Sequence, residues 1–133
     1  MANKEIEVIL IRQLASYLAT PTFIVDPVGT LVFYNEPAEG ILGRRFDETG
    51  EIAADEWTTA WTPTDEAGAA LAPEDLPLWI ALKKQRPAQR RFWIVGSDKV
   101  RRDIEVLAFP LIGQAGRHLG AVAVCWEPDE TCE

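Results

Sequence analysis

The sequence predicts an α+β fold in which helices cover one face of a five-stranded antiparallel sheet and an amphipathic amino-terminal helix covers the other face. Three observations lead to it. Two short runs of β-branched and aromatic residues flank a Pro-Gly turn near the start, three longer runs of this kind close the chain, and helical patterns lie between them. Strands joined by short turns pair antiparallel, so the closing strands form a meander that meets the first hairpin.

Size and charge narrow the classes of function. The 133 residues, 47% hydrophobic and 26% charged, suit a single globular domain. Residues 1–20 are expected to form a helix for dimerisation or capping, residues 21–128 the domain, and residues 129–133 an acidic tail. A net charge of -8 disfavours nucleic acid as a partner, because it repels phosphates. With no signal-peptide pattern and no apolar run of about 20 residues, no membrane contact and a cytoplasmic location are expected.

The amino-terminal helix, expected over residues 4–19, is apolar around most of its circumference. Its polar residues Glu5, Arg12 and Ser16 form only a narrow stripe. A helix of this kind needs a cover on two sides, and we expect these covers to be its own domain and a second copy of the chain. The candidate dimer interface combines the helix with the outer face of the sheet and comprises Ile6, Leu10, Leu14, Tyr17, Phe109, Val124 and Trp126.

The first hairpin is predicted from Thr22–Val25 and residues 30–34, joined by a turn whose proline and glycine supply the required backbone angles. Asn35 is expected to cap a short helix, Glu36–Leu42, because an asparagine side chain can accept a hydrogen bond from the first helical turn. Gly43 is expected to end this helix in the left-handed conformation.

The middle of the chain, residues 44–72, is acidic and irregular, and we expect short helical turns and loops there. Trp57 and Trp61 lie in it, four residues apart. A firmer helix is expected over residues 73–84. One side of it would carry Leu76, Trp79, Ile80 and Lys83.

The last third of the chain changes to the period of strands. Ile104, Val106 and Ala108 alternate toward one face of the sheet. Leu107 and Phe109 then point to the opposite face, which therefore also needs a cover. The three strands are predicted at residues 90–95, 103–112 and 119–127.

Three segments resemble the PAS family, in particular the sensory and signalling PAS domains of bacteria. They are PTFIVDPVGTLVFYNEPAEGILG (21–43), LAPEDLPLWIALKKQRPA (71–88) and VLAFPLIGQAGRHLGAVAVCWE (106–127). They are similar to the family's opening hairpin with its Asp, Gly and Asn, its long helix, and its closing hairpin with a Gly-rich last strand. Each motif alone is loose, whereas the three in this order are more specific. The chain departs from the family at residues 97–99, which lack the usual Asp-Gly, and at residues 127–131, which only approximate the terminal linker motif.

The resemblance implies helices that arch over one face of the sheet and enclose a pocket, which in the family holds haem, flavin, a small metabolite or nothing. The same apolar periodicity is also what a plain hydrophobic core requires. We leave the cofactor unknown. The candidate pocket residues are Phe23, Val25, Leu31, Phe33, Trp57, Trp61, Trp79, Ile80, Ile104, Val106, Ala108 and Cys125.

Specific cofactors are disfavoured by the residues that the chain offers. Haem needs an axial ligand on a pocket wall, and the sole histidine, His118, lies beside a predicted turn. Covalent flavin chemistry of the light-sensing branch needs a cysteine in a helix over the ring, but the first cysteine is Cys125, in a strand. We expect it to be a small buried residue. Two distant cysteines and one histidine predict no metal site.

We therefore predict a sensory PAS module without enzymatic activity. It would bind a small ligand or a downstream signalling protein and mediate homodimerisation. One alternative is a structural dimerisation module whose pocket is filled by its own side chains. Another is a small cone-shaped α+β hydrolase or isomerase, which would place an aspartate or histidine inside the pocket.

Overall fold

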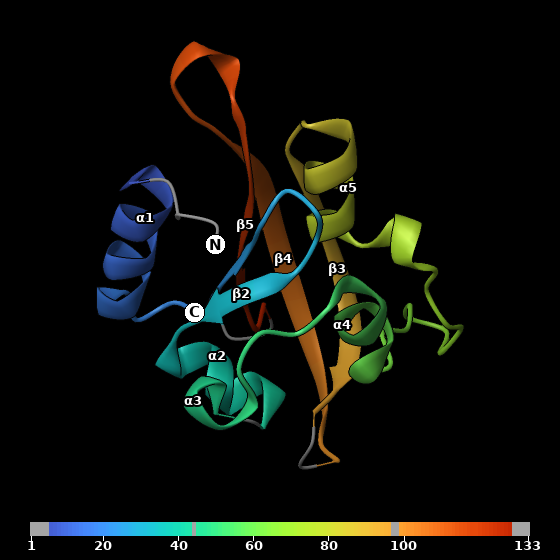
Figure 1. The fold of residues 1–133 in the computed structure, drawn as a ribbon. Helices are drawn as coiled ribbons and strands as arrows, with labels where there is room; N and C mark the ends of the chain where they lie inside the picture. The colour runs from blue at the N-terminus through green and yellow to red at the C-terminus, as the bar shows by residue number, and fades with distance from the viewer. Residues whose placement is uncertain (1–5, 44, 97–98, 129–133) are drawn as a thin grey trace.

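The computed structural model describes residues 6–43, 45–96 and 99–128, with residues 6–8 and 58–60 described by their backbone alone. The predicted acidic tail therefore lies outside the described residues. None of the helices described is long and apolar enough to cross a membrane. In chain order (Figure 1) the elements are α1 (Ile6–Tyr17), β1 (Thr22–Val25), β2 (Leu31–Tyr34), α2 (Glu36–Leu42), α3 (Phe46–Thr49), α4 (Ala54–Ala60), the 3-10 turn η1 (Pro73–Asp75), α5 (Pro77–Lys84), β3 (Ala88–Val95), β4 (Arg101–Ile112), the 3-10 turn η2 (Gln114–Gly116) and β5 (His118–Trp126).

The strands form one sheet in the order β2-β1-β5-β4-β3, and every neighbouring pair is antiparallel. The closing meander meets the first hairpin through β5, which pairs with β1 from Thr22 opposite Val124 to Val25 opposite Ala121. The last strand of the chain thus occupies the centre of the sheet. This confirms the predicted α+β fold with a five-stranded antiparallel sheet.

Local signals at the first hairpin are confirmed in detail. The Asp26 carboxylate accepts hydrogen bonds from the backbone N–H groups of Val28 and Thr30, at 3.1 and 2.9 Å, which closes the turn. Asn35 Oδ1 accepts from the N–H of Ala38 at 3.2 Å and caps α2. Gly43 ends α2 with φ 74°, the left-handed conformation that glycine adopts without strain.

The prediction that Phe33 faces the pocket is wrong, because β2 carries a bulge. Ile24 pairs with Phe33 and Val25 pairs with Leu31, so Val32 is the extra residue. An extra residue reverses the alternation of side chains beyond it. Leu31 therefore faces the main core, whereas Phe33 and Val32 face the opposite side of the sheet.

The helix predicted over residues 73–84 is interrupted at Leu76. This residue is extended, with φ -83° and ψ 135°, because the ring of the following proline disfavours the helical conformation. The chain forms η1 and then restarts as α5 at Pro77. The new start shifts the buried side of the helix to Leu78, Ala81 and Leu82, and leaves Trp79 and Ile80 half-buried. Trp79 and Ile80, expected on one side of the helix with Leu76, therefore lie beside the buried side rather than on it.

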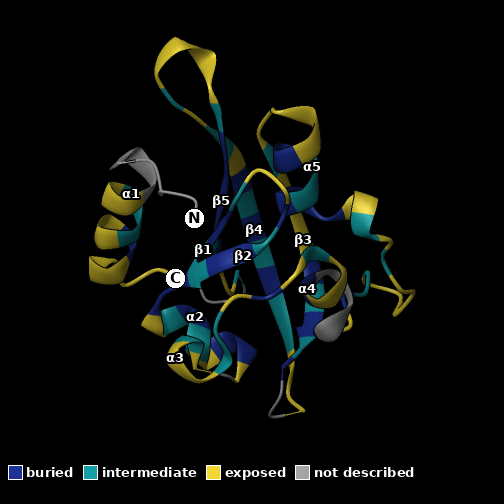
Figure 2. Cartoon of the chain, viewed as in Figure 1, coloured by how far each residue is buried: buried dark blue, intermediate teal, exposed yellow. Residues whose placement is uncertain are grey.

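Two hydrophobic clusters lie on opposite faces of the sheet. The larger one fills the space between the sheet and helices α2, α4 and α5. The smaller one contains Ala15 of α1, Ile24, Val32 and Val122, with Ile11 and Phe33 packed against it. Figure 2 shows α1 as a mainly exposed helix beside the sheet, so its own domain covers only one side of it.

Candidate functional site

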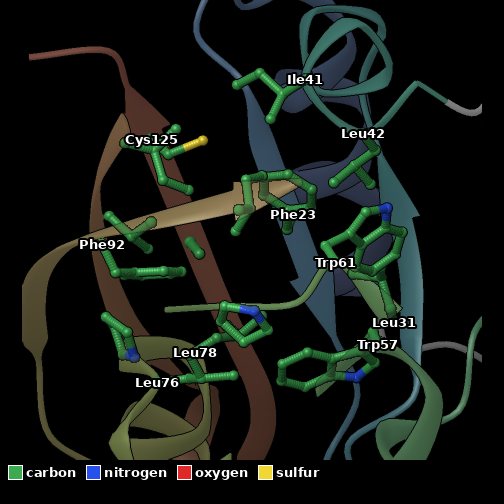
Figure 3. A pocket seen from close by; sticks show the side chains of 16 residues that line it. Phe23, Leu31, Ile41, Leu42, Trp57, Trp61, Leu76, Leu78, Phe92 and Cys125 are labelled. Atoms are coloured by element: carbon green, nitrogen blue, oxygen red, sulfur yellow. The ribbon is translucent and has the colours of Figure 1, made fainter. Parts of the chain in front are cut away.

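A cavity of about 100 Å³ lies inside the larger cluster, between the inner face of the sheet and the helices (Figure 3). Its wall is built from both halves of the chain, because the antiparallel sheet brings the first hairpin beside the closing strands. The side chains that line it are Phe23, Leu31, Ile41, Leu42, Trp57, Trp61, Pro63, Leu76, Pro77, Leu78, Phe92, Ile94, Ile104, Val106, Ala123 and Cys125.

Seven of the predicted pocket residues do lie on this wall, namely Phe23, Leu31, Trp57, Trp61, Ile104, Val106 and Cys125. Val25 and Ala108 are fully buried in the larger cluster but do not line the cavity. Trp79 packs against that cluster from its edge, with the Lys83 ammonium 4.9 Å from the centre of its ring. Ile80 is half-buried on α5 and also lies off the wall. The remaining candidate, Phe33, is on the other face.

Sequence reasoning missed several lining residues, for two different reasons. Phe92 and Ile94 alternate along the predicted strand, so the period of two could have found them. Leu78 could not be found in this way, because its orientation follows from the restart of α5 at Pro77. Ile41 and Leu42 end α2 and reach the cavity only because the chain folds this helix over the sheet.

The indole of Trp57 is held against the first hairpin. Its Nε1–H donates to the carbonyl oxygen of Gly29 at 2.7 Å, which satisfies the polar atom of this buried ring. A side chain at Gly29 would meet Ala54 Cβ at 3.1 Å, and Gly29 has φ +99°. The glycine therefore allows α4 to approach the turn closely and brings the ring to the cavity wall.

Among the side chains that the structure describes, the only ionisable one on the cavity wall is that of Cys125. Burial, with a smaller effect of the Glu127 charge, raises the pKa of this thiol to about 12. The thiol is therefore protonated at physiological pH and behaves as a small apolar side chain. An apolar cavity with these properties suits an uncharged, mainly apolar molecule.

Haem and flavin do not fit this site. Pockets for molecules of such size measure about 300–1,000 Å³, several times the volume of this cavity. The polar edge of a flavin ring would also face hydrocarbon side chains and lose its hydrogen bonds to water. His118 begins β5 outside the cavity wall and cannot serve as an axial ligand there. Within the described residues, no group of three or more His, Cys, Asp or Glu side chains could hold a metal ion.

The predicted interface residues whose side chains the structure describes share one property: their own chain leaves them uncovered or only partly covered. On α1, Leu10 and Leu14 are each 56% exposed and Tyr17 is 87% exposed. On the outer face of the sheet, Phe109 and Trp126 are exposed and Val124 is half-buried. The side chain of Ile6 lies outside the described residues.

Toward β3 the outer face becomes polar. The Arg91 guanidinium donates two hydrogen bonds to the Asp103 carboxylate, at 2.9 and 2.6 Å. These bonds hold the pKa of Asp103 below its usual range. Gln89 donates to Glu105 diagonally across the same two strands, at 3.1 Å. The exposed apolar area therefore ends before the β3 edge of the sheet.

The solved structures that resemble this arrangement of helices and strands include PAS domains. The PAS domain of a protein from Colwellia psychrerythraea is 15% identical, with 91% of this chain and 96% of that chain covered and a TM-score of 0.63. The PAS domain of the nitrogen regulation protein NR(II) from Vibrio parahaemolyticus is 17% identical, with 89% and 97% covered and a TM-score of 0.60. The LOV protein of Rhodobacter sphaeroides is 16% identical, with 93% and 68% covered and a TM-score of 0.71. No family model and no curated protein matches the sequence.

Proposed function

We propose that this chain, which has the PAS fold, is a sensory signalling module that binds a small apolar molecule in its interior cavity and acts as a homodimer. The observation that carries the proposal is the cavity of about 100 Å³, walled almost entirely by aromatic and aliphatic side chains. An apolar cavity of about 150 Å³ stays dry and binds benzene or xenon, so molecules of this size or slightly smaller are the expected ligands.

Signalling requires that the ligand bind one arrangement of the domain better than another. The cavity wall includes Ile41 and Leu42 of α2. Asn35, which caps α2, also donates a hydrogen bond to the carbonyl oxygen of Ala15 in α1. A ligand that displaces α2 slightly would therefore change how α1 sits on the sheet. A downstream signalling protein would detect this change through the dimer. A cytoplasmic location stays a prediction from the sequence.

Ligand binding can be tested with benzene. At ten times its dissociation constant, benzene is expected to raise the free energy of unfolding by about 1.4 kcal/mol. Ala123→Leu places extra carbons in the cavity and should abolish this gain. Val124→Leu is the matched control, because Val124 is the next residue of β5 and faces the opposite side of the sheet. Denaturant titrations with and without benzene measure the effect.

The benzene experiment tests one alternative, and the composition of the cavity wall bears on the other. A structural module with a filled core would show no stabilisation by benzene or xenon in the folded wild-type protein, and this result would refute the sensory proposal. A hydrolase or isomerase would need a titratable base in the cavity, and the neutral thiol of Cys125 does not supply one. The composition of the wall therefore favours binding over catalysis.

Homodimerisation can be tested at Leu14. This residue is 56% exposed on α1, the helix whose Ile11 and Ala15 pack against the outer face of the sheet. Leu14→Glu is expected to convert a dimer into a monomer, because a buried carboxylate without a partner is strongly unfavourable. Gln13→Glu adds the same charge at the adjacent exposed position and should leave the dimer intact. Light scattering measures the mass, and a wild-type monomer at micromolar concentration would contradict the proposal.

A further inference from the structure

We infer that small molecules reach the interior cavity between α2 and the end of β5, through a portal that the side chain of Arg102 holds closed. The inference deepens the proposed function, because it names the access route to the proposed ligand site. It starts from a surface groove of about 460 Å³ on the outside of this junction. Ile41 and Cys125 line both this groove and the cavity, so the two spaces share a thin wall.

Both shared residues lie at the same end of the cavity. Figure 3 shows Ile41 and Cys125 near one end, whereas Trp57, Leu76 and Leu78 lie toward the other. One residue of α2 and one of β5 thus border both the cavity and the groove.

Arg102 of β4 bridges the two elements across this wall. Its Nη1 donates to the carbonyl oxygen of Ile41 at 3.2 Å, and its Nε lies 3.8 Å from the Glu127 carboxylate, just past the end of β5. The Ile41 carbonyl is among the last of α2, where helix carbonyls lack an intrahelical partner and a cation is favoured. The guanidinium therefore fastens the end of α2 to the end of β5.

The wall on the β3 side is held in a different way. Thr64 and Trp93 exchange two backbone hydrogen bonds of 2.9 Å, and Val95 donates to the Trp61 carbonyl at 2.8 Å. Opening that wall would break this backbone pairing. At the α2 end, a side-chain bridge through Arg102 joins the two elements, so a single substitution can weaken it.

A portal residue changes rates without changing affinity. Arg102 does not line the cavity, so it does not touch the bound molecule. Its removal should raise the association and dissociation rate constants by the same factor and leave their ratio unchanged. Loss of a charged hydrogen bond across the portal predicts a factor of about ten.

The experiment uses fluorobenzene and fluorine NMR exchange on the full chain. Arg102→Ala is expected to accelerate both rate constants about tenfold, with the dissociation constant unchanged within about twofold. Arg101→Ala is the matched control, because the adjacent arginine lies over the Trp93 ring, 5.1 Å from its centre, and not at the groove. Glu127→Gln removes only the charge of the second partner and should accelerate exchange less.

A second variant acts in the opposite direction. Gly40 lies in α2 and lines the groove, and a Cβ added there meets no atom within 4 Å. Gly40→Leu should fill the mouth of the groove, slow both rate constants and slightly stabilise α2, since leucine favours a helix more than glycine does. If neither Arg102→Ala nor Gly40→Leu changes the exchange rates, the access route lies elsewhere and the inference is overturned.

The portal can also be tested without any ligand, through a thiol at position 123, which lines the cavity and not the groove. In a chain carrying Ala123→Cys, Cys125→Ser and Cys132→Ser, methyl methanethiosulfonate should modify this thiol slowly, and Arg102→Ala should accelerate the modification where Arg101→Ala does not. This separates the two proposals. Accelerated modification without fluorobenzene binding would refute the proposed ligand and keep the portal, whereas binding without any response to Arg102→Ala would refute the portal alone.

Discussion

Gly120→Ala is expected to abolish cooperative folding or to lower the free energy of unfolding by more than about 4 kcal/mol. Gly120 lies in β5 with φ +126°, a conformation that costs other residues about 1–3 kcal/mol. Its added Cβ would also overlap the carbonyl oxygen of Val25 and approach the Cα of Asp26 at 3.1 Å. Both are backbone atoms at the end of β1. The overlap could therefore be removed only if β1 and β5 moved apart.

Gly116→Ala is the matched control for this prediction. Gly116 has φ +73°, also in the left-handed region, but a Cβ there meets no atom within 4 Å. Only the backbone strain remains, and we expect a loss of about 1–2 kcal/mol. Denaturant unfolding followed by circular dichroism compares the two variants. Similar losses for both would show that the close approach of β1 to β5 does not determine the requirement for glycine.

Asn35→Ala is expected to lower the free energy of unfolding by about 3–5 kcal/mol. The buried amide uses all its hydrogen-bonding capacity. Oδ1 accepts from the N–H groups of Thr22 at 3.0 Å and Ala38 at 3.2 Å. Nδ2 donates to the carbonyls of Ala15 at 2.9 Å and Thr20 at 3.0 Å. In the alanine variant these four backbone groups lose their hydrogen bonds to the amide. They include the Ala15 carbonyl, whose bond joins α1 to the domain.

Besides lowering the free energy of unfolding, Asn35→Ala should change hydrogen exchange in one region of the domain. Hydrogen exchange should increase most in α1 and at the start of α2, because Asn35 joins these two helices to β1. Equal exchange in α1 for the variant and the wild type would contradict this role. Thr22, also buried, offers a comparison: Thr22→Val removes its hydroxyl, which donates only to the Thr20 carbonyl at 2.9 Å, and should cost less.

Asn35→Asp adds a dependence on pH. The new carboxylate would face the carbonyl oxygens of Ala15 and Thr20, so its pKa should rise above the value of about 3.9 in the unfolded chain. The folded state then binds the proton more tightly. The variant should therefore be most stable below about pH 4 and lose stability as the pH rises above this value, relative to the wild type. A constant difference between pH 3 and 8 would contradict the geometry.

The order of elements, the first hairpin and the ends of α2 could be predicted from the sequence, because they depend on neighbours in the chain. The Asp26 carboxylate closes its own turn, Asn35 caps the helix that follows it, and Gly43 ends that helix. The antiparallel sheet follows from the short connections between consecutive strands, because parallel strands would need a much longer crossover connection. The sides of the strands were predictable wherever the pairing is regular, as at Ile104 and Val106.

The sequence by itself therefore determined the strands, the capped helix and the apolar character of the site, because hydrogen bonds and periodicities between near neighbours encode them. The side of Leu78 follows from the restart of α5 at Pro77, a local effect of proline that the expected helix over residues 73–84 did not include. Only the tertiary structure decided the face of Phe33, which depends on a bulge between two strands. It also decided that Gly120 must lack a side chain and that Ile41 and Cys125 line the same cavity. These features arise from contacts between distant segments, whose spacing no local pattern records.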